Sequence, residues 1–89
     1  MIFLAIQDAQ QPDRHPMGFN CGGTDATRAT WMTDELRRAL DKDTTCVNAT
    51  QTDRGDCIVT VTVQHPSVRS VTALVRTLLG TWDREGLLV

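Results

Sequence analysis

The segment Cys21-Gly22-Gly23-Thr24 has the composition best suited to chemistry in this chain. Two glycines lead into an expected helix start, where free backbone N–H groups attract anions and lower the pKa of a thiol. Cys21 is therefore a possible reactive thiol, with His15 or His65 as its base. Asp25 opposes an anion at this helix start, and the segment lacks the lysine and the spacing of a phosphate-binding loop. A thiol-dependent enzyme or redox protein centred on Cys21 is one hypothesis for the function.

A metal or cofactor site is not indicated by the spacing of the potential ligands. Zinc sites usually take their ligands from local pairs such as Cys-x-x-Cys, and the chain has no such pair. The sequence therefore predicts no metal and no cofactor. Cysteine is present three times, and the odd number fits a reducing compartment, so we expect three free thiols. The candidate metal ligands considered were His15, Cys21, Cys46, Cys57 and His65.

Protein binding is the function that the residue types favour most. Trp and Arg are enriched at the centres of protein interfaces. The sequence predicts an interface built from the 8–23 loop and the start of the first helix, with Trp31 and Arg28 as anchors. Phe19 and Arg37 are the further candidates for this interface.

These side chains must be positioned by elements that the hydrophobic pattern predicts. Residues 57–63 are β-branched after Cys57 and alternate in character, which is typical of a central strand with one face in the core. Residues 2–7 alternate more weakly and predict a first strand. Residues 8–23 contain two Pro and three Gly and predict a long loop.

A hairpin is predicted between the strand at 45–52 and the central strand. Asp53-Arg54-Gly55 has the composition of a three-residue loop with glycine in the left-handed conformation. This loop length places Val47 opposite Val61, which keeps apolar side chains on one face of the sheet.

Two helices are predicted from apolar side chains at helical spacing. The first begins at Thr24-Asp25 and ends near residues 41–43, and the second begins at His65-Pro66-Ser67 and ends at Gly86. The expected buried face of the first helix contains Ala29, Met32, Leu36, Ala39 and Leu40. That of the second contains Val68, Val71, Leu74, Val75, Leu78 and Trp82.

The order of these elements is β-α-β-β-α, with a possible last strand at 87–89. This order matches a ferredoxin-like α+β sandwich, in which two helices cover one face of an antiparallel sheet. The first strand and the 57–63 strand would lie at its centre. We expect residues 1–89 to form a single α+β domain.

The uncovered face of such a sheet is the remaining candidate surface. It would carry one aromatic side chain and no positive charge, and the net charge of the chain is −2, so nucleic-acid binding through this face is the less favoured alternative. The same face could join two copies into a homodimer. No apolar stretch is long enough to span a membrane, and we expect a cytoplasmic protein. The sequence thus favours a small protein-binding module without catalytic machinery, acting as a regulator or inhibitor. The uncovered face would be formed by Phe3, Cys46, Asn48, Thr50, Ile58, Thr60 and Thr62.

Overall fold

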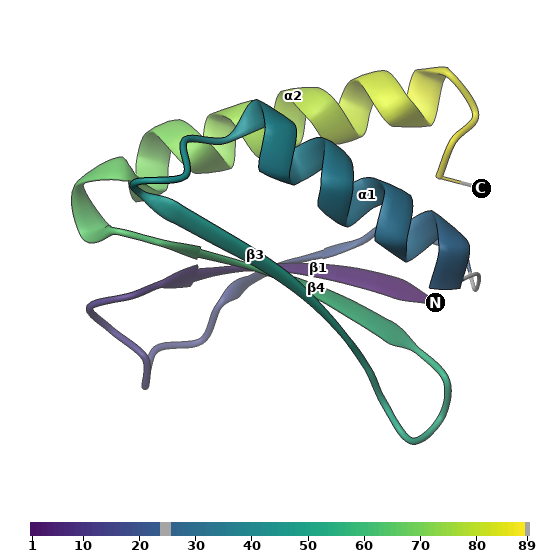
Figure 1. The fold of residues 1–89 in the computed structure, drawn as a ribbon, viewed down its shortest axis with the longest axis horizontal. Coiled ribbons are helices and arrows are strands. Elements are labelled where there is room, and N and C mark those ends of the chain that lie inside the picture. The colour runs from purple at the N-terminus through teal and green to yellow at the C-terminus, as the bar shows by residue number, and fades with distance from the viewer. Residues whose placement is uncertain (24–25, 89) are drawn as a thin grey trace.

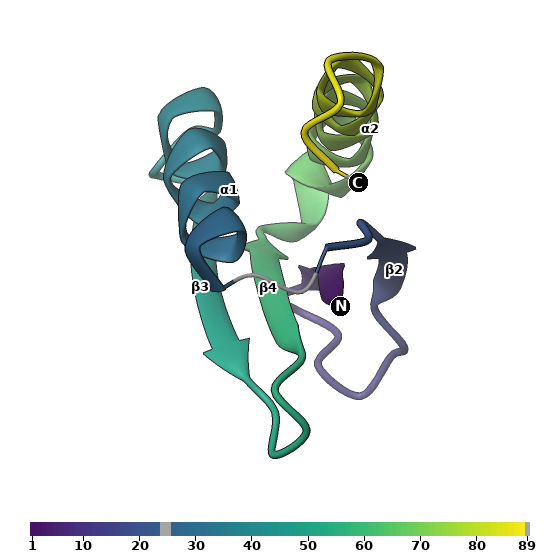
Figure 2. The same cartoon turned by 90° about the vertical axis from the view of Figure 1, so that its right-hand side faces the viewer.

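The computed structural model describes residues 1–23 and 26–88 and confirms an α+β architecture (Figure 1). A four-stranded sheet lies beneath two helices, which cover the same face of it (Figures 1 and 2). The elements in chain order are β1 (Ile2–Asp8), β2 (Met17–Asn20), α1 (Ala26–Ala39), β3 (Thr45–Gln51), β4 (Cys57–Val63), a 3₁₀ turn (His65–Ser67) and α2 (Val68–Arg84).

The sheet has the order β2-β1-β4-β3, so the two predicted central strands do lie at its centre. The prediction of an antiparallel sheet is wrong, because β1 and β4 run parallel while the two outer pairs are antiparallel. The cause is β2, which lies inside the segment predicted to be a loop over 8–23. This strand reverses the chain before α1, and every later strand therefore runs in the opposite direction to that of a ferredoxin-like sheet.

The side chains of β4 alternate between the core and the other face of the sheet, as predicted. Cys57, Val59, Val61 and Val63 are buried beneath the helices, while the intervening side chains point to the other face. The predicted hairpin register is also confirmed, since Val47 pairs with Val61. The amide of Thr52 bonds the carbonyl of Asp56, which encloses a three-residue loop, and Gly55 has a φ of 88°.

The buried face of α1 agrees with the prediction except at its end. Ala29, Met32, Leu36 and Leu40 are buried, but Ala39 is exposed. Thr33 is buried in addition, because its hydroxyl donates a hydrogen bond to the carbonyl of Ala29 and so needs no water. The predicted cap at Thr24-Asp25 lies outside the described residues.

The predicted face of α2 contains one error, Leu74, which is 40% exposed. At 100° per residue, Leu74 lies about 100° from Val75, at the margin of the buried stripe. Leu79 lies on the other side of Val75 and packs against the core in its place. Trp82 is buried, as expected for the continuation of the stripe.

The chain leaves α2 through Gly86, as predicted, with a φ of 76°. The amide of Gly86 bonds Asp83 and that of Leu87 bonds Trp82, which is the hydrogen-bond pattern of a Schellman motif. Leu87 and Leu88 do not form the possible last strand, and Val89 lies outside the described residues.

Candidate functional site

The face of the sheet opposite the helices is uncovered in the structure (Figure 2). Side chains reach it from all four strands, because each strand alternates between the core and this face. The predicted set is confirmed, and β1 and β2 add members that the sequence reading had not assigned. We call this surface the open sheet face, formed by Phe3, Ala5, Gln7, Gly18, Asn20, Cys46, Asn48, Thr50, Ile58, Thr60 and Thr62.

The apolar part of the open sheet face is concentrated in one row across the strands. Phe3 lies between Ile58 of β4 and Asn20 of β2, and Thr50 of β3 extends the row. Phe3 is 41% exposed although its side chain is large and apolar. A protein surface normally keeps such groups scattered, so a Phe–Ile pair surrounded by threonines is suited to contact with another apolar surface.

None of the side chains of the open sheet face carries a charge. A surface that binds the backbone of a nucleic acid needs lysine or arginine along it, and base stacking needs more than one aromatic ring. The open sheet face offers Phe3 alone for stacking. Its chemistry therefore suits a protein better than a polynucleotide.

Two of the predicted binding residues, Trp31 and Arg28, lie in contact on α1. The guanidinium of Arg28 is 5.5 Å from the centre of the Trp31 ring, within the range of a cation–π interaction. Trp31 also packs edge-on against Trp82 of α2, with ring centres 5.0 Å apart. Trp31 therefore joins the two helices and keeps only part of its surface for another molecule.

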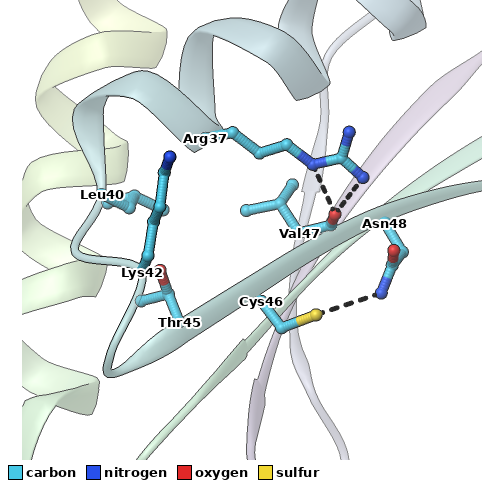
Figure 3. A pocket seen from close by; sticks show the side chains of 7 residues that line it. All are labelled: Arg37, Leu40, Lys42, Thr45, Cys46, Val47 and Asn48. Carbon is cyan, nitrogen blue, oxygen red and sulfur yellow. Dashed lines mark hydrogen bonds between the residues drawn. The ribbon is translucent and has the colours of Figure 1, made fainter.

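The other two predicted binding residues lie elsewhere and have structural contacts of their own. Phe19 of β2 is half-buried on the helix side of the sheet, with the guanidinium of Arg76 5.8 Å from its ring centre. Arg37 donates two hydrogen bonds to the carbonyl oxygen of Val47, at 3.0 Å and 2.7 Å (Figure 3). The structure thus brings together Trp31 and Arg28 only.

Cys21 is 4% exposed, and burial raises the pKa of its thiol. A raised pKa keeps the sulfur protonated at neutral pH and reduces its nucleophilicity. Its amide bonds the carbonyl of Ile2 at the start of β1, whereas His65 lies at the opposite end of that strand, beside Asp8. Seven residues of strand separate these ends by about 20 Å, so His65 is not placed to act as a base for this thiol.

A polar contact between the ends of β1 and β4 was missed by sequence reasoning. His65 Nδ1 lies 2.6 Å from Asp8 Oδ2, and this hydrogen bond is the main cause that lowers the pKa of Asp8. Asp8 ends β1, and His65 follows β4 closely. Because parallel neighbours end at the same edge of a sheet, the pair would have been predictable from parallel pairing of these strands.

Within residues 1–23 and 26–88, no group of three or more His, Cys, Asp or Glu side chains could hold a metal ion. No helix in the same residues is long and apolar enough to cross a membrane. All three cysteines are free thiols, as predicted. Comparison of the chain with protein-family models, with curated proteins and with solved structures finds no match in any of the three.

Proposed function

We propose that this chain is a protein-binding module that acts by occupying a partner protein's surface, as a regulator or inhibitor does. The observation that supports this proposal is the open sheet face, which is four strands wide, uncharged and includes the exposed side chain of Phe3. The partner would be a protein with an apolar surface of matching shape. The proposal includes a cytoplasmic location, as the three free thiols suit a reducing compartment.

The area of this face limits what it can bind alone. Three strands of seven residues, each about 23 Å long, and β2, about 13 Å long, are spaced by about 4.8 Å and together present roughly 400 Å² in projection. A typical stable protein complex buries about 800 Å² on each partner. A second copy of the chain stacked face to face is the alternative occupant, and such a dimer would be held by about half of the usual area.

The surface around Trp31 and Arg28 is the second candidate for the interface. It is favoured by a half-buried Trp covered by an Arg, next to a shallow hollow on the first two turns of α1. A partner bound there would replace the Arg28 guanidinium with its own apolar side chain.

The test compares the two surfaces by affinity capture from the native host, followed by titration of the captured protein against purified variants. Phe3→Asp places a charge in the apolar row of the open sheet face, and Thr60→Lys places one in the middle row, on the neighbouring strand β4. We expect each variant to weaken binding at least tenfold, as is typical for loss of an interface centre. Met17→Asp is the matched control, because Met17 is 45% exposed but belongs to the other face of the sheet.

Several outcomes would contradict the proposal. Binding that survives Phe3→Asp and Thr60→Lys, but is lost with Arg28→Ala, would move the interface to α1. Loss of activity with Cys21→Ser in a folded protein would favour thiol chemistry. Salt-dependent binding to random DNA or RNA would favour a nucleic-acid binder.

A further inference from the structure

The outer strand β3 has an unusual edge. Its seven residues, Thr45–Gln51, contain no charge and no proline, and only β4 pairs with it in the sheet. Natural proteins usually protect such edges with charges, prolines or bulges, because an open edge pairs with other strands.

The direction of each backbone group on β3 follows from its hydrogen bonds with β4. The carbonyl of Thr44 accepts from Gln64, and the amide of Thr52 donates to Asp56. In an antiparallel ladder bonded and unbonded pairs alternate, so the even-numbered residues of β3 bond β4 and the odd-numbered ones point outward.

The first half of this outward edge is partly occupied. The amide of Thr45 bonds the carbonyl of Asp41 at 3.0 Å, and the two bonds from Arg37 take both lone pairs of the Val47 carbonyl. In the described part of the chain, the second half keeps its groups open. These are the amide of Val47 and both backbone groups of Ala49 and Gln51.

We propose that two copies of this chain pair antiparallel through their β3 edges, with the two-fold axis at Thr50. In this register Ala49 of each copy exchanges both hydrogen bonds with Gln51 of the other, so no open group of these residues is left unpaired. Shifting the axis to Ala49 would direct the amide of Gln51 at the occupied carbonyl of Val47. The contacts of Arg37 thus disfavour pairing with the axis at Ala49.

The charges next to the edge also fit a second copy. A hollow of about 300 Å³ lies beside the start of β3, with the cationic side chains of Arg37 and Lys42 in its wall (Figure 3). In the proposed register Val47 faces Asp53 in the hairpin loop of the second copy, so this exposed carboxylate approaches the edge that Arg37 contacts. The two Arg37 side chains would be about 20 Å apart, beyond the Debye length at physiological salt, so they would not repel each other appreciably.

The pairing would join two four-stranded sheets into one of eight strands. The two open sheet faces would then be continuous and present twice the area. The idea that this larger face binds a partner rests on the proposed function. The pairing itself does not, and it can be tested without any partner.

The test is disulfide trapping in the full chain with Cys46→Ser, which removes the exposed native thiol. On the axis, facing Cα atoms of an unbonded antiparallel pair lie about 4.5 Å apart, which is within the range of a disulfide. Thr50→Cys should therefore form a covalent dimer under mild oxidation, reversible by reductant. Asn48→Cys, on the same face two residues away, is the matched control and should stay monomeric.

Sedimentation equilibrium of the protein without an introduced cysteine gives an independent measurement of the pairing. We expect association that rises with concentration and is weakened several-fold by Asp53→Lys, but not by Asp13→Lys, which changes the net charge equally at an exposed loop position. A concentration-independent monomer would overturn the proposal, as would equal trapping of Thr50→Cys and Asn48→Cys. Association that Phe3→Asp abolishes while Asp53→Lys leaves it intact would assign the dimer to the open sheet face instead.

Discussion

Leucine-to-alanine substitutions at Leu36 and Leu74 test the packing of the two helices with the same chemical change. Both positions lie inside helices, so the difference in helix propensity is the same for both. Leu36 is fully buried at 0% exposure, whereas Leu74 is 40% exposed. The difference in their cost to stability should therefore report burial alone.

The expected magnitudes follow from these exposures. Removing three carbons from a buried site forfeits about 2.4 kcal/mol of transfer free energy, at roughly 0.8 kcal/mol per CH₂. The cavity that remains raises the cost of Leu36→Ala to about 3–4 kcal/mol. At Leu74 about 60% of the transfer term applies and water fills the space, so we expect about 1.4 kcal/mol.

Urea denaturation followed by tryptophan fluorescence is a suitable assay. The contact between Trp31 and Trp82 joins α1 to α2, so its loss reports separation of the helices. A domain of this size is stable by about 4–13 kcal/mol, so the Leu36 variant should lose a large part of the total. Equal costs at the two positions, or a cost below about 1 kcal/mol at Leu36, would refute the packing described here.

Two further predictions concern a carboxylate and a glycine. The pKa of Asp8 is lowered from 3.8 mainly by the hydrogen bond from His65, so its stabilising contribution is present above that pH and is lost as the pH falls through the folded-state pKa. The difference in melting temperature between wild type and Asp8→Asn should thus be constant near neutral pH and shrink below about pH 4. A difference that stays the same at low pH would contradict this role of the carboxylate. Gly22 has a φ of 67°, and a Cβ there would collide with the carbonyl oxygen of Leu88, so Gly22→Ala should cost more than the ~1–2 kcal/mol of left-handed strain. Gly55→Ala, at a φ of 88° in open space, should cost the strain alone, and equal melting temperatures for the two variants would contradict this difference.

Local pattern was sufficient to predict much of this fold. The alternation from Cys57 to Val63 identifies both the central strand and its buried face, because successive side chains of a strand point to opposite sides. The three-residue loop fixes the pairing of Val47 with Val61, because shifting the register by one residue would turn apolar side chains to solvent. The candidate open sheet face follows from the same alternation.

The relative direction of β1 and β4 was decided only by tertiary structure. β2 has four residues, including a glycine, and its sequence has little strand character. The strand forms because β1 offers it a complete antiparallel partner, from Phe3 paired with Asn20 to Ile6 paired with Met17. Since one additional strand reverses the chain, missing it inverts the predicted direction of β4 relative to β1 and hides the Asp8–His65 contact.

The positions of individual side chains on the helices show the same division. The sequence by itself determined which stripe of α2 is apolar, because helical spacing depends only on the chain. It could not determine where the margin of that stripe lies, since this depends on how α1 and the sheet cover α2, and Leu74 was misplaced for that reason. The contacts that hold Trp31 against Trp82 and Arg37 on Val47 likewise exist only because the fold brings distant segments together.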